Sequence, residues 1–378
     1  MPAAARRLTL FLDSLAAGGA QRQIAVVAAG MAAAAWQVEL AWYNDSARFH
    51  EVPAGVTPHL LPRRARTDPR FVPALAGLVA RRRTDLVHAW LPAPALYACM
   101  AALLPGSARV IAGVRCSPSL FVDSPAQGQM TRLAAHMATA VTVNSRSMRD
   151  WLLAARVPER KVHFIGNVLT PGIAARQPAT PAQRRALLTS LGLDPEVAPI
   201  VALGRFDAFK NQDGLVRALL RLRGEGAQVP PLLLAGLLED TARVQAVRQL
   251  AQQGGWPDVH VVPAVADVPT LLEAAQFSVL ASRSEGTPNV VLEGLGLGTL
   301  VVATRVGEVP DLIADGQTGL LCNVDDEVDL ARALRRALNM LPAERRAIGQ
   351  RARADVLARF GHSVVLAQYA ALYERVLA

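Results

Sequence analysis

The chain has 378 residues, a formal net charge of +9, 52% hydrophobic residues and only three cysteines. This length predicts two domains, each with its own core, and the hydrophobic content excludes an intrinsically disordered chain. The odd number and wide spacing of the cysteines exclude a disulfide framework and a cysteine-based zinc site. The longest apolar stretches, Ile24 to Trp36 and Leu96 to Leu104, are shorter than the roughly 20 residues of a spanning helix. We therefore expect a soluble, cytoplasmic protein.

Basic residues concentrate in the first half of the chain. Residues 1–185 carry 22 Arg and Lys against 9 Asp and Glu, a net charge of +13, whereas residues 186–378 carry 18 against 22, a net charge of −4. A basic half predicts contact with something anionic, such as a membrane surface, a phosphorylated acceptor or nucleic acid. A composition bias is the alternative, because 38 of the 40 basic residues are arginine. The arginine clusters are typical of a solvated, membrane-facing surface: Arg63, Arg64, Arg66, Arg70 and Arg81–Arg83.

Short apolar runs alternate along the chain with longer stretches at helical spacing. Runs of this kind predict strands that are covered on both faces, joined by helical crossovers. In the first half the predicted strands are Leu8–Asp13, Val38–Trp42, Asp85–Trp90, Arg109–Val114, Ala140–Asn144 and Lys161–Ile165. In the second half they are Pro199–Arg205, Pro230–Gly236, Asp258–Val262, Phe277–Ala281, Leu300–Thr304 and Thr318–Cys322. The pattern predicts an α/β protein with two doubly wound, Rossmann-like domains that face each other across a cleft.

The domain boundary falls in a stretch rich in Pro, Thr and Gly between Asn167 and Pro199. We assign residues 1–171 to the first domain and residues 172–363 to the second. The amphipathic segment 364–378 is expected to pack back on the first domain. Ligands of such domains bind where glycine-rich turns follow the carboxyl ends of strands, so these turns are the places to search for a site.

The first such turn contains Gly18 and Gly19 after the opening strand. Paired glycines before a helix allow backbone amides to approach an anion, although a plain tight turn explains them equally well. A second glycine-rich segment, Gly294 to Gly298, follows a predicted helix rather than a strand. It is therefore assigned to helix packing and termination instead of nucleotide binding.

The second domain opens with a strand that ends at Gly204 and is followed by Arg205 and Lys210. An arginine fork and a lysine point charge suit a diphosphate, whereas ordinary surface charge is the competing explanation. A lysine at this strand end departs from a chain that otherwise uses arginine. The two cations therefore favour an anion site over surface charge.

The segment from Ser284 to Glu293 gives the most specific local pattern. Thr287 is expected to be the N-cap and Pro288 the first residue of a helix, whose amides would point towards an anion or a sugar oxygen. Glu293 lies five residues beyond Pro288, roughly 7.5 Å along the helix axis. Glu285 and Glu293 could thus line one cleft at different depths, although such a pair is also common as dipole compensation.

Three segments resemble the C-terminal half of glycosyltransferase family 4, whose members have the GT-B fold. They are G-R-F-D-A-F-K-N, E-G-T-P-N-V-V-L-E-G and the stretch from V-V-A-T-R-V-G-E-V-P-D to L-I-A-D-G-Q-T-G-L-L. The spacing of Glu285 and Glu293 is similar to the E-x7-E signature of that family. The first half of the chain matches more loosely, through the G-G-A-Q turn and V-N-S-R-S-M-R-D around Asn144.

The resemblance implies a retaining transfer of a hexose or N-acetylhexosamine from a UDP- or GDP-linked donor, without a metal or any other cofactor. It implies that Arg205 and Lys210 neutralise the donor diphosphate and that Glu293 binds the ribose hydroxyls. It also implies that Glu285 contacts the transferred sugar. The remaining donor-binding residues that it implies are Gly18, Gly19, Gly286, Thr287, Pro288 and Asn289.

Two positions depart from the family pattern. Arg115 stands where many relatives have a histidine, and Asn167-Val168 replaces the usual Asn-Gly at the hinge. We keep Arg115 and Asn144 as candidate cleft or acceptor residues. His88, at a strand end, is either an acceptor contact or a hydrogen-bonded core group.

The implied acceptor is a glycan or a lipid-linked sugar of cell-surface polysaccharide biosynthesis, and the basic first half favours peripheral contact with an anionic membrane at the cytoplasmic face of the inner membrane. A nucleotide-sugar epimerase of GT-B fold is one alternative, against which the E-x7-E spacing argues. A catalytically degenerate transferase acting as a partner protein is another. Nucleic-acid binding is not expected, because only 5% of residues are aromatic and no binding motif occurs.

Overall fold

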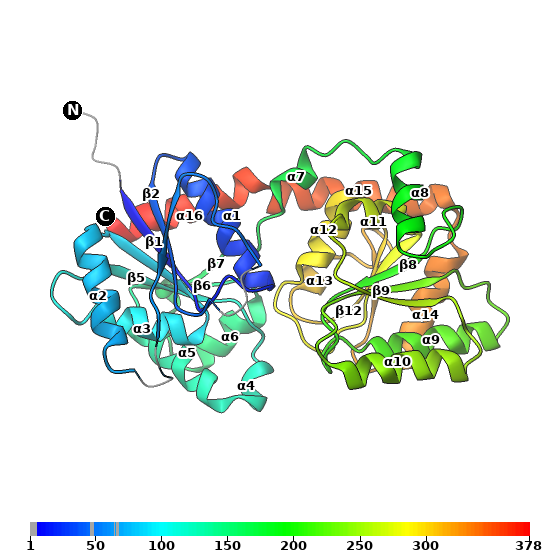
Figure 1. Ribbon diagram of the computed structural model, residues 1–378, viewed down its shortest axis with the longest axis horizontal. Coiled ribbons are helices and arrows are strands. Elements are labelled where there is room, and N and C mark those ends of the chain that lie inside the picture. The colour runs from blue at the N-terminus through cyan, green and yellow to red at the C-terminus, as the bar shows by residue number, and fades with distance from the viewer. Residues whose placement is uncertain (1–5, 46–48, 64, 66–67) are drawn as a thin grey trace. The chain divides into compact units, whose positions relative to one another are not determined.

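The computed structural model describes residues 6–45, 49–63, 65 and 68–378, which divide into two compact units (Figure 1). The first unit comprises Met1–Val168 together with His362–Ala378, and the second comprises Leu169–Gly361. Both divisions lie within three residues of the boundaries expected from the sequence. Arg64 and Arg66 of the first arginine cluster lie outside the described residues.

The first unit is built on a seven-stranded parallel sheet with the order β3-β2-β1-β4-β5-β6-β7. Strands β4 and β6 are buried along their whole length, as expected for a sheet covered by helices on both faces. The strands are β1 (Arg7–Phe11), β2 (Gln37–Trp42), β3 (Val56–Leu60), β4 (Leu86–Trp90), β5 (Arg109–Val114), β6 (Ala140–Val143) and β7 (Val162–Phe164).

Helices cover this sheet, and the last helix of the chain is among them. It packs against the first helix, so the C-terminal segment belongs to the first unit (Figure 1). The helices are α1 (Gly19–Ala33), α2 (Phe71–Arg82), α3 (Pro92–Ala101), α4 (Leu120–Asp123), α5 (Pro125–Met137), α6 (Arg146–Ala154), the 3-10 helix η1 (Glu159–Lys161) and α16 (His362–Leu377).

The second unit is built on a six-stranded parallel sheet with the order β10-β9-β8-β11-β12-β13. Two interior strands of this sheet, β11 and β12, are again buried along their whole length. The strands are β8 (Ile200–Leu203), β9 (Leu232–Gly236), β10 (Val259–Pro263), β11 (Phe277–Leu280), β12 (Val301–Thr304) and β13 (Leu320–Cys322).

Nine helices accompany this sheet in the described chain, and they alternate with its strands. No helix among the described residues of either unit is both long and apolar enough to span a bilayer. The helices are α7 (Pro171–Ala174), α8 (Pro181–Ser190), α9 (Gln212–Gly224), α10 (Thr241–Gln253), α11 (Val268–Ala274), α12 (Asn289–Leu297), α13 (Val309–Leu312), α14 (Glu327–Asn339) and α15 (Pro342–Phe360).

All twelve predicted strands are present, and one further strand, β3, was missed. Its sequence V-T-P-H-L contains a proline and leaves three of its five residues exposed. β3 pairs only with β2 at the edge of the sheet. A proline is tolerated at an edge because no second neighbour needs its missing N–H, but it removes the alternation by which a strand is recognised.

The glycines of α12 serve helix packing, as expected. A Cβ at Gly294 would lie 2.9 Å from Val301, and a Cβ at Gly296 would lie 2.9 Å from Leu169. Gly298 ends the helix in the left-handed conformation with a φ of 78°. This segment is therefore confirmed as structural rather than nucleotide-binding.

Candidate active site

The strand order of the second unit places a crevice at the ends of β8 and β11. The chain runs from β8 to β9 on one side and later to β11 on the other side, so the loops after β8 and β11 diverge. Ligands of open α/β sheets bind at such a switch point, outside the carboxyl ends of the strands. The loops are residues 204–211 and 281–288. They carry all the predicted second-domain donor residues except Asn289 and Glu293, which lie in α12.

The loop after β8 is shaped by Gly204 and Asp207. Gly204 has a φ of 157°, and a Cβ there would lie 3.3 Å from Cε of Lys210, so the bare glycine leaves room for the lysine side chain. The Asp207 carboxylate accepts hydrogen bonds from the backbone N–H groups of Phe209 and Lys210, at 3.0 and 3.1 Å. This turn fixes the backbone from which Lys210 extends.

Lys210 and Glu285, predicted separately from the two loops, form an ion pair in the structure. Nζ of Lys210 lies 2.5 Å from Oε1 of Glu285, and the two side chains are 20% and 13% exposed. Arg205 is 62% exposed, and its Nη2 lies 3.2 Å from Oδ2 of Asp207. One partly buried and one open cation therefore flank the switch point, and each is paired with a carboxylate.

The two loops are also tied together through their backbones. The N–H of Arg283 donates to the carbonyl of Phe209 at 2.6 Å, and Nη1 of Arg283 donates to the carbonyl of Ala208 at 3.0 Å. Nδ2 of Asn211 donates to the carbonyl of Ala281 at 3.2 Å. These bonds join residues 70 to 75 positions apart and hold Lys210 opposite Glu285.

Helix α12 begins one residue later than the sequence predicted. Asn289 is its first residue and Pro288 is the N-cap, so the assignment of Thr287 as N-cap was wrong. Pro288 is extended, with a ψ of 117°, and its carbonyl accepts from the N–H groups of Val291 and Leu292. The preceding backbone is held by the N–H of Glu308, which donates to the carbonyl of Gly286 at 2.9 Å. The helix can therefore start only after this anchored turn.

The predicted carboxylates differ in their surroundings. Glu293, on the second turn of α12, is only 5% exposed, whereas Glu285 lies in the loop and faces Lys210. A carboxylate as buried as Glu293 requires hydrogen-bond donors or a polar ligand to be tolerated. Gly307, between β12 and α13, approaches the same loop so closely that a Cβ there would overlap the carbonyl oxygens of Glu285 and Gly286. Three loops thus converge at this edge of the sheet.

A pocket lies at the ends of β8 and β11, within the second unit. Its lining includes Gly204, Lys210, Gln212 and Ser282. Oε1 of Gln212 and Oγ of Ser282 are buried without a hydrogen-bond partner among the described residues. The pocket therefore offers polar groups next to Lys210, as a binding site at the switch point requires.

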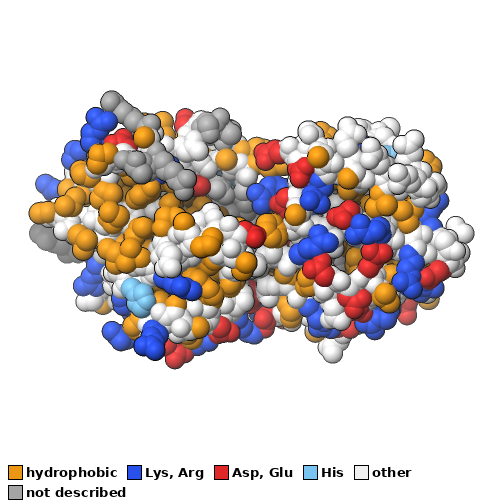
Figure 2. All heavy atoms as spheres, turned by 90° about the horizontal axis from the view of Figure 1, so that it is seen from below, with side chains coloured by type: hydrophobic (Ala, Val, Ile, Leu, Met, Phe, Trp, Pro, Cys, Tyr) orange, Lys and Arg blue, Asp and Glu red, His pale blue; other side chains and the backbone are white. Residues whose placement is uncertain are grey.

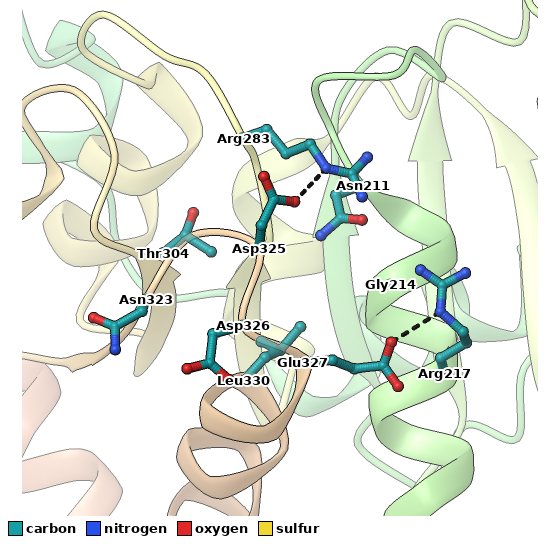
Figure 3. Close-up of a pocket in the computed structure, with 10 residues that line it drawn as sticks. All are labelled: Asn211, Gly214, Arg217, Arg283, Thr304, Asn323, Asp325, Asp326, Glu327 and Leu330. Carbon is teal, nitrogen blue, oxygen red and sulfur yellow. Dashed lines mark hydrogen bonds and ion pairs between the residues drawn. The ribbon is translucent and has the colours of Figure 1, made fainter.

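A second pocket lies beside these loops, on the side of α9 and α14 (Figure 3). Two ion pairs flank it, Arg283 with Asp325 at 2.5 Å and Arg217 with Glu327 at 2.9 Å. None of the predicted donor residues lines it, and both arginines are neutralised by carboxylates. The first pocket is therefore the better candidate for a diphosphate.

No group of three or more His, Cys, Asp or Glu side chains with metal-binding placement occurs in the described part of the chain.

The first unit has its own switch point, between β1 and β4. Gly18 and Gly19 lie in the turn after β1, with Gly18 as the N-cap and Gly19 as the first residue of α1. The first turn of α1 contains no acidic residue, so the partial positive charge of the helix N-terminus is not compensated there. The predicted strand–glycine–helix arrangement is confirmed, and it is suited to an anion.

The sequence reasoning missed two basic residues beside this turn, Arg22 and His50. The N–H of Arg22 donates to the carbonyl of Gly18, and burial lowers the pKa of its guanidinium from the usual value. Burial, together with the charge of Arg22, also lowers the pKa of His50. An arginine in the first turn of a helix opposes the helix dipole, and this was a signal in the sequence that could have identified it.

Arg115 and Asn144 converge on Asn167 at the carboxyl edge of the first sheet. The guanidinium of Arg115 stacks on Trp90 at 4.1 Å, and its Nη1 donates to Oδ1 of Asn167 at 3.4 Å. Nδ2 of Asn144 donates to the same oxygen at 3.1 Å. Burial lowers the pKa of Arg115 to about 9. Within the first unit, both residues therefore hold the segment that leads out of it.

The hinge position Val168 needs no glycine. Its N–H donates to Oε1 of Gln23 at 2.7 Å, and its carbonyl accepts from Nε2 of Gln23 at 2.9 Å. Its φ is not among the positive values found in the described chain. The side chain of Val168 is instead buried in the core of the first unit. The side-chain amide of Gln23 thus fixes the backbone at the position where the family pattern has a glycine.

His88 is a core group. It is completely buried, and its Nδ1 and Nε2 lie 2.8 Å from Oη of Tyr373 and 2.9 Å from Oγ1 of Thr142. Burial, with a smaller contribution from Arg115, lowers the pKa of His88 well below its ordinary value. Of the two sequence interpretations, the hydrogen-bonded core group is the one that these contacts support, because no face of the ring is open to an acceptor.

We expect His88→Gln to reduce the pH dependence of stability. Because folding depresses the pKa of His88, its stabilising effect is complete above the unfolded value of about 6.5 and is lost as the pH falls below it. The wild-type free energy of unfolding should therefore fall between pH 7 and pH 5, with up to about 1.4 kcal/mol per pH unit from this residue. Urea unfolding at several pH values measures the slope. An identical slope in the variant would contradict the buried, neutral state of His88.

Two family models match the chain. Residues 17–171 match the model described as Glycosyltransferase Family 4, and residues 198–340 match the model described as Glycosyl transferases group 1. The first match includes the glycine turn at the start of α1, and the second includes both loops of the switch point. The two matches divide at the boundary between the units.

Curated relatives agree with these models. Alpha-maltose-1-phosphate synthase of Mycolicibacterium smegmatis is 33% identical over 262 residues, which is 65% of this chain and 66% of that protein. N-acetyl-alpha-D-glucosaminyl L-malate synthase of Bacillus anthracis is 24% identical over 314 residues, which is 80% of this chain and 78% of that protein. The match to the first relative therefore spans just under two thirds of its length.

Solved structures share the fold. The crystal structure of Anabaena Alr3699/HepE in complex with UDP has a TM-score of 0.83 to this chain at 18% identity. The superposition covers 98% of this chain and 100% of that chain. The arrangement of two parallel sheets with alternating helices is therefore shared over the full length.

Proposed function

The chain belongs to the family-4 glycosyltransferases of GT-B fold, and from this premise we propose that it is a retaining, metal-independent enzyme that uses a nucleotide sugar. The proposed donor is a UDP- or GDP-linked hexose or N-acetylhexosamine. In the proposed reaction a bond from the sugar C1 to an acceptor oxygen replaces the bond to the β-phosphate oxygen. The acceptor proton leaves with the nucleoside diphosphate, so atoms and charge balance.

The placement of Arg205 and Lys210 at the switch point of the second unit is the observation that carries this proposal. A leaving diphosphate gains negative charge as the C1–O bond breaks. Fixed cations at the position where this charge develops are among the largest catalytic contributions available to an enzyme. Lys210 is already held by a fixed turn, so little reorganisation is needed when the donor binds.

The carboxylates are assigned to the sugar parts of the donor. Glu293, buried in α12, accepts hydrogen bonds from the ribose hydroxyls, and Glu285 contacts the transferred sugar. The segment from Gly286 to Asn289, including Thr287 and Pro288, presents backbone groups at the start of α12 to the sugar and the phosphates. In the first unit, Gly18 and Gly19 offer the N-terminus of α1 as a site for an anion such as a phosphate.

We assign the acceptor to a glycan or a lipid-linked sugar of cell-surface polysaccharide biosynthesis, with the enzyme peripheral on the cytoplasmic face of the inner membrane. The charge of the units supports this. The first unit has 20 Arg and Lys against 10 Asp and Glu, a net charge of +10, whereas the second has 20 against 21. A strongly basic unit is suited to an acceptor held at an anionic surface.

The test is an assay of nucleoside diphosphate release from UDP- and GDP-linked sugars, with and without a panel of glycan and lipid-linked acceptors. We expect acceptor-dependent release that is unchanged by EDTA, and an anomeric configuration in the product equal to that of the donor by NMR. Epimerised donor without acceptor would instead support the GT-B epimerase. Release without a glycosylated product would overturn the transferase.

Glu285→Gln is expected to lower kcat/KM about 10- to 100-fold with the correct donor. The amide keeps the size of the side chain but loses the charge that pairs with Lys210 and polarises the sugar hydroxyls. The measurement is steady-state transfer, with UDP binding followed by calorimetry. Glu196→Gln is the matched control, because it removes a carboxylate from an exposed ion pair with Arg185 in the same unit. A wild-type rate of sugar transfer by Glu285→Gln would show that Glu285 is not part of the active site.

A further inference from the structure

Large hydrophobic side chains are exposed mainly on the first unit. Of thirteen such residues in the described part of the chain, ten belong to the first unit and three, Val197, Val328 and Leu341, to the second. Figure 2 shows hydrophobic side chains over a broad area of the first unit, whereas charges of both signs are interspersed on the second. A large apolar patch on one unit indicates an interaction surface.

Five of these ten residues lie on helices α3 and α5, which pack side by side, or in the loop that follows α3. Leu103 is 75% exposed and Leu133 is 52% exposed, so neither is needed for the core. They protrude from helices and from a loop rather than lining a groove. The α3–α5 apolar surface comprises Met100, Leu103, Leu104, Leu133 and Met137.

Cations border this surface on the side of α2. A Cβ at Gly106 would lie 3.4 Å from Cβ of Ala80, which places the loop after α3 against the end of α2. The exposed segment Arg81–Arg83 follows there. Arg82 pairs with Glu39, whereas Arg81 and Arg83 have no acidic partner within ion-pair distance among the described residues.

Cations also border the surface on α5. Arg132 precedes Leu133 on α5, and its guanidinium stacks over the ring of Trp151 at 4.7 Å. Nζ of Lys161 donates to the carbonyls of His136 and Ala138 at 2.9 and 2.8 Å, on either side of Met137. Asp123, at the end of α4, is the acidic residue nearest to α5 in the sequence. Cations therefore border the apolar side chains on two sides.

We propose that the α3–α5 apolar surface docks on an anionic lipid bilayer, with its leucines and methionines inserted at the interface and its arginines on lipid phosphates. Exposed apolar tips with a basic rim are the combination by which peripheral proteins bind such membranes. A second copy is disfavoured, because pairing through this face would oppose two basic rims on units of net charge +10. The inference rests on the proposed function only for its purpose, which is access to a lipid-linked acceptor.

The test is flotation of the full chain with vesicles of phosphatidylcholine and phosphatidylglycerol, without donor or acceptor. We expect wild-type protein to float with the anionic vesicles and to dissociate from them at high salt. It should not bind vesicles of pure phosphatidylcholine. The variant Leu103→Asp/Leu133→Asp should bind at least tenfold more weakly. The matched control Val197→Asp/Val328→Asp, which places the same charges on exposed apolar positions of the second unit, should bind like wild type.

Equal binding of both double variants to anionic vesicles, or no binding of the wild type, would overturn the proposal that the α3–α5 apolar surface docks on a bilayer. A wild-type dimer in light scattering that Leu103→Asp/Leu133→Asp dissociates would also overturn it, in favour of a second copy. Thermal unfolding of each variant shows that folding is retained. The stabilisation of the protein by UDP and by GDP, measured without vesicles, reports on the donor site separately, so failure of the proposed function is distinguished from failure of the membrane proposal.

Discussion

Lys210→Ala is expected to lower kcat/KM for sugar transfer by about 10²- to 10³-fold, the loss found when one fixed donor to a developing anion is removed. Two effects combine in this variant. The diphosphate loses the cation closest to the switch point, and Glu285, only 13% exposed, loses its ion-pair partner at 2.5 Å. An unpaired carboxylate next to the diphosphate site repels the donor, so KM should rise while kcat falls. Steady-state kinetics with the correct donor measures both.

Two further variants separate charge from structure. Lys210→Arg keeps the positive charge and should retain more transfer than Lys210→Ala, although the planar guanidinium cannot reproduce the point charge of lysine. Arg185→Ala removes a cation from an exposed ion pair of the same unit and should leave kinetics and thermal stability within error of wild type. If Lys210→Ala loses only stability and keeps its kcat/KM, Lys210 is a structural residue and the diphosphate binds elsewhere.

The fold could be predicted to a large extent because parallel strands buried on both faces are continuous apolar runs. Twelve strands are recognisable in this way, from the first at Arg7–Phe11 to the last at Leu320–Cys322. The strand that escaped, β3, lies at an edge where tertiary pairing with β2 outweighs its proline and its exposed residues. The start of α12 was misplaced by one residue because the deciding contact, from Glu308 to Gly286, comes from another loop.

Only those residues of the candidate site that have a recognisable local sequence pattern could be predicted. Arg205, Lys210 and the carboxylates are found because each lies next to a strand end or a helix start. The bonds between Arg283 and the carbonyls of Ala208 and Phe209, which set their mutual geometry, have no local signal. His88 shows the converse, since its position at a strand end suggested a contact with a ligand. Its partners Thr142 and Tyr373 come from distant segments that only the folded chain brings together.

Gly307→Ala is expected to abolish most transfer although residue 307 carries no functional side chain. Its Cβ would overlap the carbonyl oxygens of Glu285 and Gly286, so the loop that carries Glu285 must move. A displacement of about 1 Å in a catalytic group can cost about 10²-fold in rate. We expect a loss of that size in kcat/KM, together with weaker binding of the donor nucleotide. Kinetics and calorimetry with the nucleoside diphosphate measure the two effects.

Gly298→Ala is the matched control for backbone strain. Gly298 has a φ of 78° and Gly307 a φ of 53°, so both substitutions impose the left-handed conformation on alanine at a cost of about 1 to 2 kcal/mol. A Cβ at Gly298, however, would approach only the carbonyl of Gly349, at an ordinary 3.6 Å. Gly298→Ala should therefore lower the melting temperature and keep donor binding. Gly307→Ala should lower the melting temperature and also weaken donor binding. Equal donor binding by the two variants would show that the loop accommodates the added Cβ without displacing Glu285. Gly307 would then not be required to position Glu285.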